Sequence, residues 1–231
     1  MSVDASLPVA FMGDPHGDFS AARNLPPVHA IEALIVAGDL HVPAPLDELA
    51  SEIRPELWWI PGNHDYDQDG YHDRLFASPL ATRNLHGRVV EIAGLRVAGL
   101  GGVFVGRVWN PREAPEPRYL TRSAYLADLP RRDRWRDGLP RRIRKAIWYE
   151  DVARLARMQA DVLVCHEAPS CHKYGFAEID ALAEAMGVRL VVHGHHHTHY
   201  TGSICGGRIA VLGLAKGEIC RADGTRLAGP D

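Results

Sequence analysis

Five short blocks of Asp, His, Asn and Gly residues recur along the chain, and their side chains are types that bind metal ions. The blocks are Gly13-Asp14-Pro15-His16, Gly38-Asp39, Gly62-Asn63-His64-Asp65, Cys165-His166-Glu167 and Gly194-His195-His196-His197. Carboxylate, amide and imidazole ligands suit Mn²⁺, Fe or Zn²⁺ better than Ca²⁺. Glycines beside them allow the backbone to turn sharply and to approach bound ions closely. The combination predicts a site for metal-assisted chemistry.

Each block follows a short apolar run that is typical of a buried strand. The predicted strands are Pro8–Met12, Ala33–Ala37, Leu57–Ile60, Asp161–Cys165 and Val188–Val192. In open α/β sheets, ligands bind beyond the carboxyl ends of strands, where loops converge. A single Gly-Asp after a strand is most often a simple turn, but five such elements in one order are not expected by chance. We therefore expect the five loops to meet at one site.

Further strands and helices complete an α/β pattern. Arg88–Ile92 and Leu95–Leu100 flank a hairpin signal at Ala93-Gly94, and Arg208–Leu212 is predicted as the last strand. Helices are predicted over Leu46–Ile53, Arg141–Met158 and Ala177–Met186. No internal repeat is visible, so residues 1–231 are expected to form a single domain.

The composition of the 231-residue chain, 46% hydrophobic and 24% charged, argues against disorder, a fibrous repeat and a coiled coil. No apolar run approaches the roughly 20 residues of a membrane span, and the N-terminal residues lack the basic start of a signal peptide. The four cysteines are too few for a disulfide scaffold and match no common zinc spacing. We expect a cytoplasmic protein without a membrane partner, whose cysteines are reduced and buried.

The five blocks, in their order, resemble the signature of the calcineurin-like metallophosphoesterase superfamily. The resemblance spans residues 9 to about 197. It implies an α/β fold of four layers, in which two mixed β-sheets are flanked by helices. It also implies hydrolysis of a phosphoester with two divalent metal ions, for which we expect Mn²⁺, with Fe or Zn²⁺ as the alternatives.

The resemblance also implies a role for each matching residue. The implied ligands of one ion are Asp14, His16 and His197, those of the other are Asn63, His166 and His195, and Asp39 bridges both. Two ions about 3.5–4 Å apart suit in-line attack on phosphorus by a metal-bridging hydroxide. His64 is the expected catalytic acid for the leaving oxygen, or a donor to the transition state. Asp65 either orients His64 or caps the loop.

Several other polar residues lie near the blocks and are candidates for positioning the ligands. They are Asp18, His41, His193, His196 and His199. The alternative for each of them is a solvated loop residue. The chain lacks the Asp-Arg-Gly extension after Asp39 that the protein Ser/Thr phosphatase branch carries, and its third block ends in Asp65 rather than Glu. A protein phosphatase of that type is therefore disfavoured.

The charge is unevenly distributed, and this bears on the substrate. The net charge is −3, yet residues 107–157 hold 14 Lys+Arg and seven Asp+Glu, a local charge of +7 that leaves −10 elsewhere. A basic insert at about 107–145, containing Pro, Arg and Trp residues, interrupts the α/β rhythm. Arg141, Arg142 and Arg144 are its candidate substrate-binding residues, since a basic surface with aromatic side chains can hold phosphates and stack bases. An amphipathic helix with solvated arginines is the alternative.

We therefore expect a phosphodiesterase or nucleotide phosphohydrolase, with a nucleotide or a nucleic-acid end as possible substrate. Two alternatives stay open at this point. One is a phosphomonoesterase of small molecules, and the other is a non-catalytic metal-binding or scaffold protein that retains the fold. The sequence does not indicate an oligomeric state.

Overall fold

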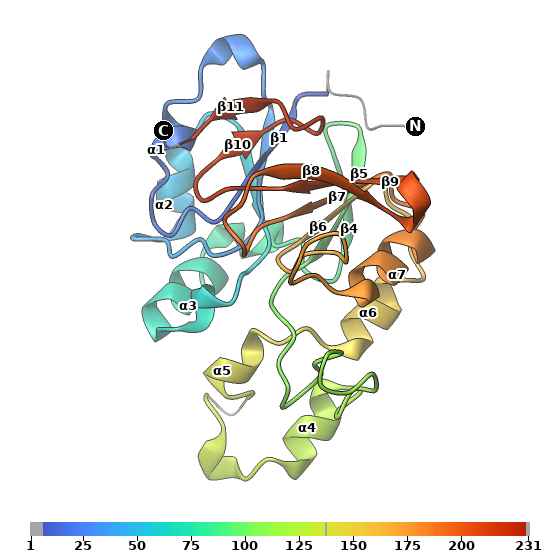
Figure 1. Cartoon of the computed structure of the whole chain (residues 1–231). Coiled ribbons are helices and arrows are strands. Elements are labelled where there is room, and N and C mark those ends of the chain that lie inside the picture. The colour runs from blue at the N-terminus through green and yellow to red at the C-terminus, as the bar shows by residue number, and fades with distance from the viewer. Residues whose placement is uncertain (1–6, 137, 230–231) are drawn as a thin grey trace.

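Two mixed β-sheets form the centre of the molecule in the computed structural model, which describes residues 7–136 and 138–229 (Figure 1). The first sheet has the order β11-β10-β1-β2-β3 and the second has the order β4-β5-β6-β7-β9-β8. The strands of the first sheet are β1 (Val9–Met12), β2 (Ala33–Val36), β3 (Glu56–Trp59), β10 (Ile219–Cys220) and β11 (Arg226–Ala228). Those of the second are β4 (Val89–Ile92), β5 (Leu95–Leu100), β6 (Val162–Cys165), β7 (Leu190–His193), β8 (Tyr200–Ile204) and β9 (Ile209–Gly213).

The strands that precede the metal-binding blocks are parallel neighbours within each sheet. In the first sheet β1 pairs with β2 and β2 with β3 in parallel, while β10 is antiparallel to β1. In the second sheet β5, β6, β7 and β9 are parallel, and the hairpin partners β4 and β8 are antiparallel. The carboxyl ends of β1, β2 and β3 therefore lie at one edge of the first sheet, and those of β6 and β7 at one edge of the second.

Helices cover the outer faces of the sheets. The helices are α1 (Ser20–Arg23), α2 (Leu46–Ser51), α3 (Asp69–Phe76), α4 (Arg122–Asp128), α5 (Arg141–Arg144), α6 (Tyr149–Leu155) and α7 (Ala177–Ala185). The side chains of β1 alternate between two cores, with Phe11 packed between the sheets and Met12 packed against the helices. Leu163 and Val164 of β6 divide in the same way. This alternation confirms the predicted four-layer α/β arrangement, and the expected fold class is correct.

The predicted helix over Arg141–Met158 is wrong, because it is interrupted after Lys145: Ala146 forms a bridge with Val103, and Ile147 and Trp148 belong to no helix. Val103 donates its backbone N–H to the Lys145 carbonyl at 2.8 Å, and Ile147 donates to the Val103 carbonyl at 2.9 Å. This pairing buries three consecutive side chains, those of Ala146, Ile147 and Trp148. A single helix would have turned one of the three towards solvent. The chain therefore forms α5, a short extended segment and α6 in succession.

Two further expectations from the sequence need correction. Arg208–Leu212 is not the last strand, since β10 and β11 follow it, and β8 precedes it with three exposed central residues that give no apolar signal. Cys165 and Cys220 are buried as predicted, but Cys171 is exposed and Cys205 is half-buried. None of the helices in the described part of the chain has the length and apolarity needed to cross a membrane.

A buried carboxylate of α6 is one of the contacts that attach the basic insert to the rest of the chain. Asp151 of α6 is 1% exposed, and it accepts hydrogen bonds from Arg122 of α4 at 2.5 Å and from Arg154 at 2.7 Å. Trp109 and Trp148 are buried core residues, so the rings of these two insert tryptophans are not available to stack bases. In Figure 1 the part of the insert with α4 and α5 extends away from both sheets.

Candidate metal centre

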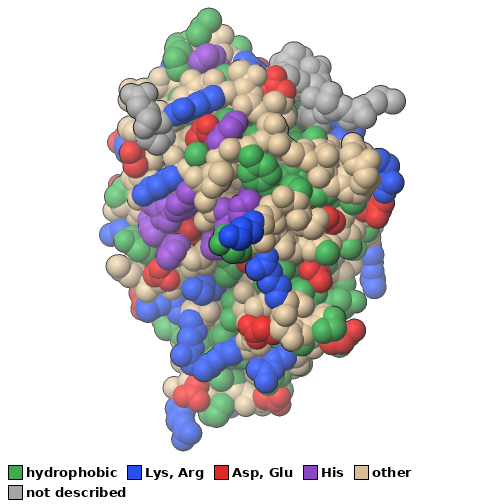
Figure 2. All heavy atoms as spheres, in the orientation of Figure 1, with side chains coloured by type: hydrophobic (Ala, Val, Ile, Leu, Met, Phe, Trp, Pro, Cys, Tyr) green, Lys and Arg blue, Asp and Glu red, His purple; other side chains and the backbone are tan. Residues whose placement is uncertain are grey.

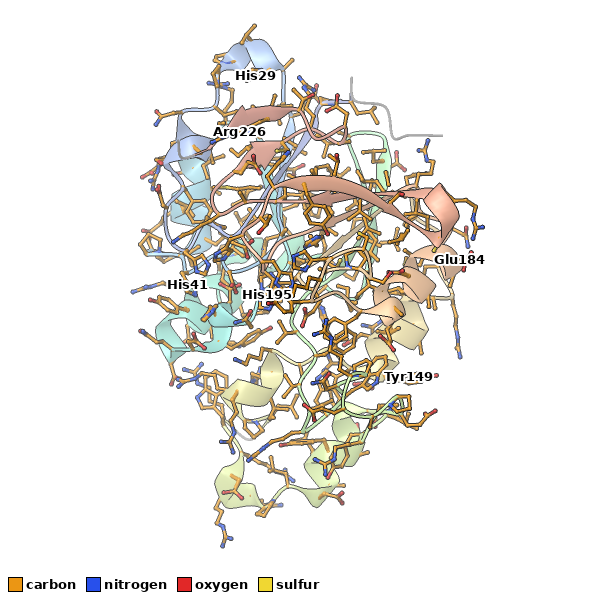
Figure 3. All side chains as sticks on the ribbon, in the orientation of Figure 1. His29, His41, Tyr149, Glu184, His195 and Arg226 are labelled. Atoms are coloured by element: carbon orange, nitrogen blue, oxygen red, sulfur yellow. The ribbon has the colours of Figure 1, made fainter. Side chains whose placement is uncertain are left out.

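The five loops predicted to carry ligands converge where the two sheets face each other. In Figure 3 the labelled His41 and His195 mark this region, into which side chains from both sheets project. Asp14, Asp39 and His166 are almost completely buried there. The loops come from β1, β2 and β3 of one sheet and from β6 and β7 of the other, as the sequence predicts.

One group of metal-binding side chains contains four of the predicted ligands. The ligand atoms of Asp14, His16, Asp39 and His197 all lie within 4.8 Å of one another. The His16 Nε2 atom is 3.0 Å from His197 Nε2 and 3.8 Å from Asp39 Oδ2. These atoms come from three loops that are far apart in the sequence, and they could hold one metal ion.

A second group shares Asp39 with the first. The ligand atoms of Asp39, His166 and His195 also lie within 4.8 Å of one another. The His166 Nε2 atom is 3.5 Å from Asp39 Oδ2 and 3.1 Å from the amide Oδ1 of Asn63. His166 Nδ1 donates to the Ala37 carbonyl at 2.8 Å, which fixes the ring so that Nε2 faces the group. All seven predicted ligands are thus brought together, with Asp39 common to both groups.

Three glycines leave room for the carboxylates and imidazoles. A Cβ atom on Gly38 would lie 2.3 Å from His166 Nδ1, one on Gly62 would lie 2.2 Å from Asp39 Oδ1, and one on Gly194 would lie 2.5 Å from Asp14 Oδ2. No side chain fits at these distances. These three glycines are therefore required because their backbone is in direct contact with the candidate ligands.

The backbone at most of the candidate ligands is left-handed. Five of the seven have positive φ, namely Asp14 (33°), His16 (45°), Asp39 (51°), His195 (68°) and His197 (52°). His41, which contacts His16, has φ of 46°. Positive φ is uncommon for residues other than glycine, although Asp, Asn and His tolerate it better than most. Such strain is concentrated at functional sites.

Burial and mutual charge set the protonation of the site. Burial raises the pKa of Asp14 to about 7 and lowers the pKa of both His16 and His195 to about 4. Burial opposes the charged form of His166, but Asp39 and Asp14 outweigh it and raise the pKa of His166 to about 10. Against the effect of its own burial, His166 holds the pKa of Asp39 below its usual range. His16 and His195 are consequently neutral near pH 7, which is the form that binds metals.

The residues fit a pair of cations. Asp14 and Asp39 place two buried carboxylates beside one another, and His166 is the buried group that offsets their charge. The ring nitrogens of His16 and His197 also face each other at 3.0 Å, so only one of them can carry the proton between them. Divalent ions would satisfy the facing nitrogens and neutralise the carboxylates.

His64 lies at the edge of the cluster. Its ring centroid is 5.7 Å from that of His16, and its backbone N–H donates to Asp39 Oδ1 at 2.8 Å. The Nδ1 atom of His64 is 2.6 Å from the carboxylate of Asp67, a residue that was not predicted from the sequence. Asp65 instead accepts the backbone N–H groups of Gly62 and His41, so it caps the loop and does not orient His64.

The other candidates for positioning the ligands differ in their surroundings. Only His41 touches a predicted ligand through a ring nitrogen, with its Nδ1 atom 3.3 Å from Nδ1 of His16, and its ring stacks on Tyr71. His193 is bound to Tyr200, His196 stacks on His172 and His199 is bound to Glu218. Asp18 accepts the backbone N–H of Ser20 in an exposed loop.

Glu167, whose role the sequence does not reveal, is buried and accepts the backbone N–H of Phe104 at 3.1 Å. Phe104 lies just ahead of the basic insert, so Glu167 ties the start of the insert to the loop of His166. Burial raises the pKa of Glu167 to about 7. The only feature of the sequence that could have drawn attention to Glu167 is its position next to His166.

The three candidate substrate-binding arginines have different partners. Arg141 forms an ion pair with Asp69 of α3, and Arg144 lies over the ring of Trp135 and donates to the Leu139 carbonyl. Arg142 is exposed and has no ion-pair partner among the described residues. Arg136 also lies over the Trp135 ring, with its guanidinium carbon 4.2 Å from the centroid. The Trp135 ring is therefore engaged by arginines of the insert itself.

Known proteins resemble this chain in sequence and in fold. The model of the family described as "Calcineurin-like phosphoesterase" matches residues 7–199. The chain is 43% identical over 195 residues to an uncharacterized protein of Haemophilus influenzae, with 84% of each chain covered. Its fold is similar to the crystal structure of the protein TT1561 of Thermus thermophilus, with a TM-score of 0.57 at 18% identity, covering 96% of this chain and 97% of the other.

Proposed function

The chain belongs to the calcineurin-like phosphoesterase family, and we propose that it is a phosphoester hydrolase dependent on two metal ions, either a phosphodiesterase or a nucleotide phosphohydrolase. The family typically binds two divalent metals, and the Asp/His cluster for them is present. The observation that carries the proposal is the pair of ligand groups that share Asp39. A carboxylate common to two groups is the arrangement that a dinuclear centre needs. When bound, two divalent ions would activate water for attack on phosphorus and neutralise the phosphoryl oxygens.

In this proposal the residues of the two groups act as ligands. Asp14, His16 and His197 would hold one ion, Asn63, His166 and His195 would hold the other, and Asp39 would contribute to both. The Ala37 carbonyl orients His166 by accepting a hydrogen bond from its Nδ1 atom. The Nδ1 atom of His41 contacts the Nδ1 atom of His16 and so helps to position that ring. We expect Mn²⁺ as the metal, since the mixed oxygen and imidazole ligands suit it, with Fe or Zn²⁺ as alternatives.

His64 has a different role in the proposal. It lies beside the ligand Asn63 but belongs to neither group, and its Nδ1 atom is held by Asp67. With Nδ1–H donating to Asp67, the acid form of His64 would be the doubly protonated ring, whose second proton is on Nε2. Transfer of that proton to the substrate would leave the neutral ring, still held by Asp67. We assign it as the acid that protonates the leaving oxygen.

The preference for a nucleotide or a phosphodiester is supported by the basic insert, which lies beside this acid. Asp67, the partner of His64, lines a surface hollow together with Arg141 and Arg142. Phosphate oxygens are common ligands of arginine guanidinium groups. The third arginine, Arg144, contributes indirectly by packing against Trp135.

Hydrolysis of bis-p-nitrophenyl phosphate tests the proposal. The purified protein with added Mn²⁺ should release p-nitrophenolate, and chelation of the metal should stop the release. Turnover of p-nitrophenyl phosphate alone would indicate a phosphomonoesterase. No turnover of either compound with Mn²⁺, Fe²⁺ or Zn²⁺ would contradict the proposal and favour a protein that retains the fold without catalysis.

A further inference from the structure

A surface hollow of about 490 Å³ lies next to the proposed acid and has no role in the proposed reaction so far. Its lining comes from the loop after β3, from α3 and from the basic insert. The residues used below are Tyr66, Asp67, Asp69, Trp135, Arg142 and Lys145. Asp67 connects the hollow to the centre, because its carboxylate is 2.6 Å from Nδ1 of His64. The hollow therefore begins at the residue that holds the proposed acid.

Most charged side chains around the hollow are already engaged. Asp69 is paired with Arg141, and Asp67 with His64. Arg142 and Lys145, in contrast, have no carboxylate within ion-pair distance among residues 7–136 and 138–229. Asp133 is the remaining carboxylate of the lining, and it is exposed to water. Two unpaired cations are thus present at the hollow, together with one unpaired carboxylate.

The same two cations also line a neighbouring hollow of about 500 Å³. Arg107 and Arg118 line this second hollow as well, and they likewise lack an ion-pair partner among the described residues. The carboxylate of that second hollow, Glu113, accepts a hydrogen bond from Asn110. Arg142 and Lys145 therefore stand on the boundary between two hollows in which cations exceed free carboxylates. Figure 2 shows Lys and Arg side chains gathered below the histidine patch on this face.

The aromatic residues of the hollow do not offer a free ring for base stacking. The Trp135 ring is covered by the guanidiniums of Arg136 and Arg144, and its edge meets His72 at 4.9 Å between centroids. Tyr66 is buried and packs on Phe76. What the hollow presents to a ligand is consequently charged side chains, and Arg142 and Lys145, which it shares with the strongly cationic neighbouring hollow, are the unpaired cations among them.

From these contacts we infer that Arg142 and Lys145 bind a second anionic group, a phosphate carried by the leaving group of the substrate. The inference rests on the proposed function, because it needs a scissile phosphate at the metal centre and His64 beside it. Guanidinium and ammonium groups both form charge-assisted hydrogen bonds with phosphate oxygens. The substrate class that this arrangement selects is a phosphoester with a further phosphate on its leaving side, such as a nucleoside bisphosphate or a short oligonucleotide.

Binding of two matched nucleotides tests the inference without depending on turnover. Thymidine 5′-monophosphate and thymidine 3′,5′-bisphosphate are titrated calorimetrically into the protein with Mn²⁺ added, and phosphate release is followed in parallel. We expect the bisphosphate to bind about tenfold more tightly than the monophosphate. In the double variant Arg142→Ala with Lys145→Ala, the ratio of the two dissociation constants should fall to near one. Using the ratio cancels any effect that the substitutions have on both nucleotides.

Two further variants complete the test. Arg131→Ala with Arg132→Ala removes the same charge from an exposed part of the insert outside the hollow, and it should keep the wild-type ratio. The exchange Arg142→Lys with Lys145→Arg keeps both charges and should retain most of the preference. A ratio near one in the wild type, or an equal loss in both Ala variants, would overturn the inference. Hydrolysis of bis-p-nitrophenyl phosphate would then still stand, so this failure is distinct from failure of the proposed function.

Discussion

The Oδ2 atom of Asp67 lies 2.6 Å from Nδ1 of His64, at the end of the short 3₁₀-helix that begins at His64. Both side chains are nearly half exposed, so this contact is not a buried structural ion pair. It fixes which nitrogen of His64 faces the cluster. The finding places a positioning residue for the proposed acid just beyond the block that the sequence identifies.

Substitution of His64 should separate chemistry from metal binding. In His64→Ala, kcat for bis-p-nitrophenyl phosphate should fall by about 100-fold, which is within the range for general acid catalysis. Asp67→Ala should lower kcat about tenfold, because the ring is kept but is no longer oriented. Both variants should retain two equivalents of metal by elemental analysis. An unimpaired rate in His64→Ala would remove its proposed role.

Substitution of Asp39 should remove both ions. The carboxylate belongs to both ligand groups, so Asp39→Asn should leave less than one equivalent of Mn²⁺ after gel filtration and abolish turnover. Asp18→Asn is the control, since Asp18 is an exposed carboxylate that accepts only from Ser20 in the first loop. The Asp18→Asn variant should bind two equivalents of Mn²⁺. Two bound ions in Asp39→Asn would contradict the bridging assignment.

Substitution of Gly62 by alanine should disturb the candidate metal centre, because the added methyl group would project from the backbone into the ligands. The added Cβ would meet Asp39 Oδ1 at 2.2 Å, so Gly62→Ala should displace the shared carboxylate and lower metal content and kcat together. We also expect it to destabilise the fold by about 1–3 kcal/mol, as overpacking commonly does. Gly70→Ala in α3 is the control, because its nearest neighbour is 4.0 Å away. That change should stabilise the helix by up to about 1 kcal/mol.

The buried Asp151 should make the attachment of the insert sensitive to acid. Although burial acts in the opposite direction, His86 and Arg122 hold the pKa of this carboxyl well below its usual range. The ionised form therefore stabilises the fold at every pH above the unfolded value of 3.8, and the contribution is lost progressively as the pH falls below it. Asp151→Asn should lower the free energy of unfolding by about 2 kcal/mol at pH 7.

Urea unfolding at pH 7 and at pH 3 measures this effect. The difference between wild type and Asp151→Asn should be smaller at pH 3. Asp161→Asn is a matched comparison, since Asp161 pairs with Arg96 at the surface, where ion pairs contribute about 1 kcal/mol or less. Equal differences at both pH values for Asp151→Asn would contradict a charged Asp151 in the folded protein.

The ligand loops could be predicted because each rule that they obey is local. A buried strand followed by Gly-Asp or by Gly-Asn-His-Asp is visible in a single stretch of sequence, and parallel pairing brings the strand ends together. Asp67 could not be found in this way, because it is one of several acids in 65–73 and its partner is fixed only by the 3₁₀ turn. Its spacing of three from His64 was the available signal.

The elements that were predicted wrongly or not at all are those that depend on pairing with a segment distant in the sequence. Residues 141–158 have helical periodicity, but pairing of Ala146 with Val103 interrupts the helix between Lys145 and Tyr149. Strand β8 has an exposed centre and is specified by its partner β9 rather than by its own pattern. Lys145 was not among the candidate substrate-binding residues, because its place beside Arg142 depends on that break after α5.

The left-handed backbone at five of the seven candidate ligands has a consequence for how the chain can be altered. Glycine is the residue that best relaxes such a backbone, yet glycine has no side chain to bind a metal, so a change to glycine at these positions favours the backbone and removes a ligand. Stability and metal capacity are therefore opposed within the same loops. Metal ions that bind only the folded chain would stabilise it and so offset the strain of these loops. The fraction of the protein that is folded should therefore depend on the supply of metal.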